Sequence, residues 1–96
     1  MSELKNITQF LSNTGKRSLA LQVIDHFASK YENILQIKEI SEAYFYSYDY
    51  DKSLEFLNLL LKQELDYEQK NYVLANIANI YIIQNKPQEA LDLLDK

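Results

Sequence analysis

The chain repeats one pattern three times, and this repetition restricts its possible folds more than any other feature. The copies align when Gly15, Tyr48 and Asn85 are superimposed, at spacings of 33 and 37 residues. A unit of this length cannot bury its apolar face alone, so stacked neighbours must supply the core. The sequence therefore predicts a single domain over residues 1–96, with repeats at approximately 1–33, 34–70 and 71–96. The aligned small positions are Thr8, Ser41, Ala78, Ala20, Ser53 and Ala90.

Apolar residues recur at the spacing of an amphipathic helix through most of the chain. The first two stripes are Leu4, Ile7 and Leu11, then Leu19, Val23 and Phe27. With one glycine and one proline in 96 residues, the chain lacks the turn signals of an all-β fold. We expect about six helices joined by short loops, with neighbouring helices antiparallel. Their expected ranges are 3–13, 16–30, 34–47, 50–64, 67–84 and 87–96.

Several residues predict where these helices begin. Asp66 with Gln69 three positions later forms a capping-box pattern, and Pro87 suits the first turn of the last helix. The other expected N-caps are Asp49 or Asp51 for the fourth helix and Asn13 or Thr14 for the second.

One segment, "YFYSYDYD" at 44–51, alternates tyrosine with other residues as a strand would. Tyr44 and Tyr48 can nevertheless share a helix face, and a lone strand would have no partner for its backbone. We therefore expect a helix followed by a turn. Tyr44 and Tyr81 fall at core positions of the repeat, whereas Tyr46, Tyr50 and Tyr72 suit either packing or surface contact.

The charge distribution limits the partners that the chain can bind. Its net charge is −4, and residues 34–70 hold eight acidic residues against four basic ones. Nucleic acid and anionic membranes are poor partners for such a surface, whereas a basic or neutral protein is acceptable. The absence of cysteine fits a reducing compartment, and the first residues do not form a signal peptide. We expect a cytoplasmic protein.

No residue pattern indicates catalysis, a cofactor or a metal. Gly15 precedes Lys16, but a phosphate-binding loop would need glycine where Phe10 stands. His26 is the only histidine, and its neighbour Asp25 would point in a different direction on a helix. The acidic residues of the middle repeat lack the spacing of a calcium loop and suit a solvated face. We therefore expect no enzyme activity.

The repeat resembles the tetratricopeptide repeat, most clearly in "LANIANIYIIQNKPQEALDLL" of the third copy. The residues that carry this resemblance are Leu74, Ile77, Ala78, Tyr81, Ala90 and Leu94. It implies an all-α fold, a right-handed α-solenoid of antiparallel helical hairpins. Because Tyr48 and Asn85 replace the usual turn glycine, we expect looser turns there. Three extra residues near 62–70 are expected to lengthen the fourth helix or its loop.

The resemblance also implies a function, the binding of a peptide or helix in a concave groove lined by the first helix of each repeat. The groove residues expected from the register are Lys5, Gln9, Lys38, Glu42, Phe45, Tyr72, Asn76 and Asn79. An alternative is self-assembly through the C-terminal repeat, with Ile80, Ile83, Leu91 and Leu94 as contacts. A third possibility is a regulatory segment of a larger enzyme or sensor.

Overall fold

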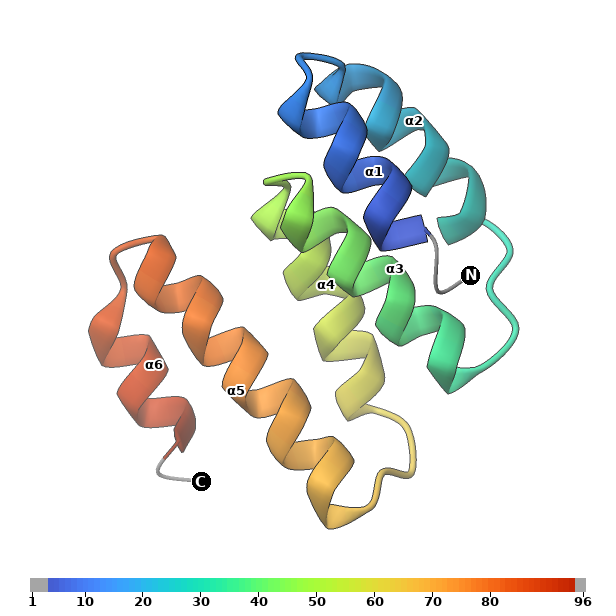
Figure 1. The fold of residues 1–96 in the computed structure, drawn as a ribbon. Helices are drawn as coiled ribbons and strands as arrows, with labels where there is room; N and C mark the ends of the chain where they lie inside the picture. Colours follow the sequence, from blue (N-terminus) through green and yellow to red (C-terminus); the bar gives the residue numbers. More distant parts are fainter. Residues whose placement is uncertain (1–3, 95–96) are drawn as a thin grey trace.

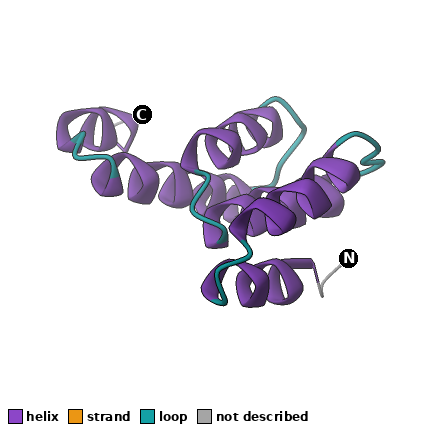
Figure 2. Ribbon diagram, turned by 90° about the horizontal axis from the view of Figure 1, so that it is seen from above, coloured by secondary structure: helices purple, strands orange, loops and turns teal. Residues whose placement is uncertain are grey.

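The computed structural model describes residues 4–94, with only the backbone described at Leu94, and these residues form six α-helices and no strand (Figures 1 and 2). The predicted all-helical chain of six helices is confirmed. No helix in this range is both long and apolar enough to cross a membrane. The helices are α1 (Leu4–Asn13), α2 (Arg17–Ala28), α3 (Ile34–Tyr46), α4 (Tyr50–Leu61), α5 (Tyr67–Ile83) and α6 (Pro87–Leu94).

The turns within the three helix pairs α1–α2, α3–α4 and α5–α6 share one backbone conformation. Gly15, Tyr48 and Asn85 have φ angles of 81°, 67° and 61°. In each turn the next residue donates its N–H to a carbonyl five residues earlier, which is the bond of a Schellman motif. The expectation of looser turns at Tyr48 and Asn85 is therefore wrong, because the same bond closes all three. These bonds are Lys16 to Leu11 at 2.8 Å, Asp49 to Tyr44 at 3.0 Å and Lys86 to Tyr81 at 2.7 Å.

Most predicted helix starts are confirmed. The side chain of Asp66 accepts from the N–H of Gln69 at 2.8 Å, and the Gln69 side chain accepts from the N–H of Asp66 at 3.0 Å. Asp49 caps α4 and Pro87 begins α6.

The predicted cap of the second helix is wrong. α2 follows Lys16, and no side chain caps it. Asn13 ends α1, and the hydroxyl of Thr14 donates to the carbonyl of Phe10 at 2.9 Å. Because this hydroxyl bonds back to the helix before it, it cannot serve the first N–H groups of the helix after it.

The tyrosine-rich segment 44–51 is a helix end followed by a turn, as predicted. α3 continues through Tyr46, the left-handed residue Tyr48 reverses the chain, and α4 begins at Tyr50. The alternating pattern thus does not reflect a strand.

The extra residues of the third repeat lie in α5, so the expectation that they lengthen the fourth helix or its loop is wrong. α2 and α4 each have 12 residues, whereas α5 has 17 residues against 13 in α3. The loops 29–33 and 62–66 are equally long. The Asp66 capping box stabilises the added first turn of α5, because it satisfies N–H groups that the helix itself leaves free.

The core is built on the aligned small positions and the larger residues beside them. All six small residues are at most 4% exposed. Tyr44 is buried as predicted, and Tyr81 is half-buried against the core. The first two stripes are not wholly buried, because Ile7 is 51% exposed and Leu19 and Phe27 are also exposed.

Candidate functional site

A hollow lies between α3 and α5, two of the helices that were expected to line the groove. α1 packs against α3, but no Cα atom of α5 comes within 8 Å of one in α3, and α5 packs against α4 instead. At the repeat position five residues before each turn residue, α3 has Ala43 and α5 has Ile80, both fully buried. A methyl group permits close helix packing, whereas a larger side chain increases the distance between helix axes.

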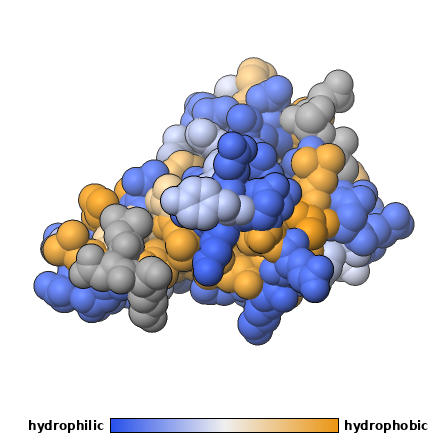
Figure 3. All heavy atoms as spheres, turned by 90° about the horizontal axis from the view of Figure 1, so that it is seen from below, coloured by the Kyte–Doolittle hydropathy of each residue, from blue (hydrophilic) through white to orange (hydrophobic). Residues whose placement is uncertain are grey.

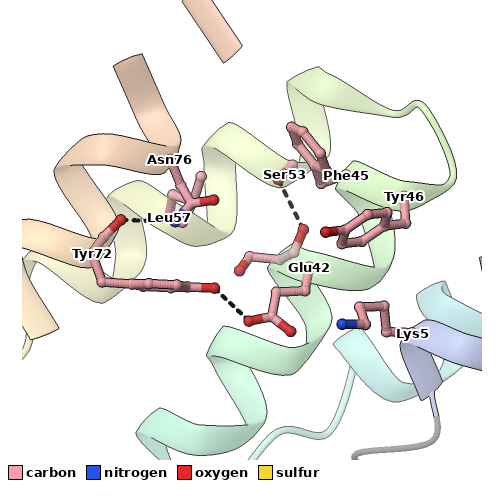
Figure 4. Close-up of a pocket in the computed structure, with 9 residues that line it drawn as sticks. Lys5, Glu42, Phe45, Tyr46, Ser53, Leu57, Tyr72 and Asn76 are labelled. Atoms are coloured by element: carbon pink, nitrogen blue, oxygen red, sulfur yellow. Dashed lines mark hydrogen bonds between the residues drawn. The ribbon is translucent and has the colours of Figure 1, made fainter. Parts of the chain in front are cut away.

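The space between these two helices contains a cleft of about 200 Å³ (Figure 4). α3 and α5 supply most of its wall, α4 supplies its floor, and one lysine comes from α1. Figure 4 shows the polar ends of Glu42, Tyr46, Tyr72 and Lys5 directed toward the same space. The lining residues are Lys5, Ser41, Glu42, Phe45, Tyr46, Ser53, Leu57, Tyr72 and Asn76.

A hydrogen-bonded pair connects the two walls. The Tyr72 hydroxyl donates to the Glu42 carboxylate, and the Asn76 side-chain amide donates to the Tyr72 carbonyl at 2.8 Å. Burial raises the pKa of Tyr72, and its hydrogen bond to Glu42 raises that pKa further. The Tyr72 hydroxyl is therefore a proton donor at neutral pH, and Glu42 retains a second carboxylate oxygen that can accept from a ligand.

Two lysines from equivalent repeat positions lie over tyrosine rings of the following helix pair. The Nζ of Lys38 is 4.6 Å from the Tyr72 ring centroid, and the Nζ of Lys5 is 5.2 Å from that of Tyr46. Such contacts contribute about 0.5–1 kcal/mol at exposed sites. They hold both tyrosine rings at the rim of the cleft.

A second, more apolar hollow of about 360 Å³ lies beside the first, and Tyr72 lines both. The added turn of α5 forms part of its wall through Glu68 and Gln69, and Leu35 on α3 is 60% exposed at its edge. The two hollows together offer polar and apolar surface on either side of one tyrosine. The residues of the second hollow are Ile34, Leu35, Lys38, Leu60, Leu65, Glu68, Gln69, Tyr72 and Val73.

Most of the groove residues expected from the sequence lie at these hollows. Lys38 lines the second hollow, whereas Gln9 is half-buried and Asn79 is exposed, and neither lines a hollow described above. The expected residues that line the first cleft are Lys5, Glu42, Phe45, Tyr72 and Asn76.

Sequence reasoning missed the residues that α4 and the loop before α5 contribute. Ser53 and Leu57 belong to α4, and Leu65 precedes α5. The register assigned the groove to the first helix of each repeat, so these residues carried no signal. Ser53 and Leu57 are buried at the base of the first cleft, and Leu65 is half-buried at the second hollow.

The residues predicted as assembly contacts differ in how exposed they are. Ile80 is fully buried in the core, so its assignment as an intermolecular contact is wrong. It faces the preceding helix pair rather than the end of the molecule. Ile83 is 49% exposed and Leu91 is 57% exposed. The side chain of Leu94 lies outside the described part of the chain.

The cleft combines hydrogen-bonding groups with aromatic surface. Its acceptors and donors suit a peptide backbone or a polar side chain, and its rings suit an apolar one. His26 lies apart from it, exposed on α2, with its ring edge-on to Phe27. Between residues 4 and 94, no group of three or more His, Asp and Glu side chains is close enough to hold a metal ion.

Comparisons with protein-family models, with curated proteins and with solved structures find no match to this chain.

Proposed function

We propose that this chain is a non-enzymatic protein-interaction module that binds a peptide or helix in the cleft between α3 and α5. The single observation that carries the proposal is the pair of adjoining hollows with Tyr72 between them. A bound segment would place polar groups against Glu42 and Asn76 and an apolar side chain in the second hollow. This division of contacts is typical of peptide recognition, where backbone bonds give affinity and pockets give specificity.

We also propose that the architecture is a tetratricopeptide-like, right-handed solenoid of helical hairpins. The equal backbone conformation at Gly15, Tyr48 and Asn85 supports this proposal, as does the burial of all six aligned small residues. Both features are typical of a stacked repeat. A cytoplasmic location is proposed on the absence of cysteine.

The partner is proposed to be basic or neutral. Residues 34–70 carry eight acidic and four basic residues, and they supply most of the wall of the cleft. Glu42 is the carboxylate directed into the cleft, and Glu68 lies at the second hollow. A partner with lysine or arginine beside an apolar residue would match both charge and shape.

The test is a selection from a random peptide library displayed on phage, followed by titration of the enriched peptides. We expect Glu42→Ala and Tyr72→Ala each to weaken binding at least about tenfold, which corresponds to about 1.4 kcal/mol. Asn79→Ala is the matched control, because Asn79 is exposed on the same helix but lines neither hollow. Circular dichroism establishes that each variant remains folded.

Backbone amide shifts then locate the bound peptide. Changes centred on residues 38–46 and 68–76 agree with the proposal. Peptides that bind the Glu42 and Tyr72 variants as well as the original chain, or that shift amides elsewhere, would disprove the assignment of the cleft.

A further inference from the structure

The outer face of α1 is apolar at positions that the other repeats bury. Ile7 is 51% exposed, although its counterparts Ile40 and Ile77 are at most 1% exposed. Phe10 is 66% exposed and occupies the same repeat position as two fully buried residues, Ala43 and Ile80. In α3 and α5 this face meets the preceding helix pair. The first pair therefore presents the surface of an internal repeat without a neighbour on it.

The opposite end of the arrangement is formed by α5 and α6 (Figure 1). Ile83 occupies the repeat position two residues before the turn residue. In the first repeat this position holds Asn13, which accepts a hydrogen bond from Tyr48 at 3.0 Å. In the second it holds Tyr46, which lines the cleft together with Tyr72. Asn13 thus contacts the following helix pair, whereas Ile83 is 49% exposed.

Leu91 on α6 agrees with this interpretation. Its counterparts Leu21 and Leu54 pack half-buried against the core, but Leu91 is 57% exposed. On the face shown in Figure 3, hydrophobic atoms form several separate patches. Isolated exposed apolar residues are ordinary, but clusters at repeat positions that are otherwise buried mark an interaction site.

We infer that a second copy of this chain covers the first helix pair, so that copies associate head to tail. The α5–α6 end of one copy would pack on α1 of the next as α1 and α2 pack on α3. The two surfaces correspond by repeat position to the two sides of that junction. The two segments that contain these surfaces also differ in net charge, since residues 1–33 hold four basic and three acidic residues and residues 71–96 hold two and three. This inference is independent of the peptide cleft.

A head-to-tail contact joins two different surfaces, so every assembly that does not close into a ring leaves one of each free. The association should therefore grow with concentration rather than stop at a symmetric dimer. Phe10→Glu would block one surface and Ile83→Glu the other, since each places a charge in a contact that would exclude water. Both residues are largely exposed, so neither change should unfold the monomer.

The experiment is light scattering on a sizing column over about a hundredfold range of concentration. For the original chain we expect a mass that rises above 11.3 kDa with concentration. Each single variant should stay at 11.3 kDa, and an equimolar mixture of the two should form a dimer of about twice that mass. The mixture dimerises because each variant retains the surface that the other lacks.

Tyr67→Glu is the control, because Tyr67 is 81% exposed and lies at neither surface, and it should associate like the original chain. A monomer at every concentration would overturn the inference. A symmetric contact would also overturn it, because one of the two variants would then still dimerise alone and the mixture would restore nothing. If Phe10→Glu loses its helical circular dichroism, Ile7→Glu takes its place in the same experiment, and the expected masses are the same.

Discussion

The two junctions between helix pairs differ in how closely they are packed. At the first, α1 and α2 both contact α3, Arg17 donates its Nε–H to the carbonyl of Ser47 at 2.8 Å, and the Tyr44 hydroxyl donates to Asp25 at 2.5 Å. At the second, α5 contacts α4 but stands away from α3, and the Tyr72–Glu42 bond spans the opening between them. One junction is closed and the other contains the cleft.

The difference shows that two junctions of one repeated pattern can be packed differently. Ala43 and Ile80 occupy one repeat position and are equally buried, but they differ in volume. At the closed junction the small residue allows α1 and α3 to approach. At the open junction the equivalent residue is the larger Ile80, and α5 packs on α4 rather than on α3. Substitutions at the two junctions should therefore have different effects.

The largest effect is expected for Tyr44→Ala at the closed junction. Tyr44 is 1% exposed, its ring lies 5.7 Å from that of Phe56, and its hydroxyl bonds to Asp25. Removal of a buried aromatic ring costs about 3–5 kcal/mol of unfolding free energy. Urea unfolding followed by circular dichroism measures this loss. Tyr72→Ala at the open junction should cost much less, and equal losses would contradict the comparison.

The next effect is expected for Ala43→Ile, which places the residue of the open junction in the closed one. Overpacking of a buried site costs about 1–3 kcal/mol, and the added atoms should push α1 from α3. Urea unfolding gives the stability, and amide shifts in α1 report the displacement. An unchanged stability with unchanged shifts in α1 would show that Ala43 does not set the close approach.

A smaller effect is expected for Asp66→Ala, which removes the capping box of α5. Loss of an N-cap side chain costs about 1 kcal/mol, and the added first turn of α5 should fray. Hydrogen exchange at the amides of residues 67–70 measures the fraying. Glu64→Ala, in the exposed loop before the helix, is the control and should leave exchange unchanged. Equal exchange in both variants would exclude the capping box as the cause.

The smallest effect is confined to alkaline pH. Burial, followed by hydrogen bonds to Asp25 and Glu42, raises the pKa values of Tyr44 and Tyr72 above 10.0. The folded state therefore holds these protons more tightly than the unfolded state, so their stabilising contribution is complete below pH 10 and is lost as the pH rises beyond it.

Urea unfolding between pH 8 and pH 11 tests this expectation and compares the two junctions. Tyr44→Phe should reduce the alkaline decline more than Tyr72→Phe, because Tyr44 is 1% exposed and Tyr72 is 36% exposed. If the unfolding free energy declines equally in both variants and in the original chain, the decline is caused by other groups.

The local features were predictable from the sequence because they depend on neighbouring residues. Asp66 and Gln69 cap α5 in any environment, and the period of apolar residues reveals each helix. Thr8 and Ser53 lie at aligned small positions of the repeat, and both are buried. Lys5, Glu42 and Tyr72 were assigned to one groove by register, and they lie together at the cleft.

Features that depend on which neighbour covers a surface were not predictable. Ile7 and Ile40 share a repeat position and a side chain, yet one is exposed and the other buried, because α3 has a helix pair before it and α1 does not. Ile80 was expected to be an intermolecular contact, but it is fully buried in the core of the molecule, where α5 packs on α4.

The sequence by itself determined six helices and where most of them begin, because hydrogen bonding and apolar period act over a few residues. Only the tertiary structure decided that α3 and α5 stand apart, that Leu57 and Leu65 face the opening and that Phe10 lies on an uncovered surface. The physical reason is that a residue is buried only where a second surface covers it. The volume of a buried side chain, in turn, affects the distance to the helix packed against it.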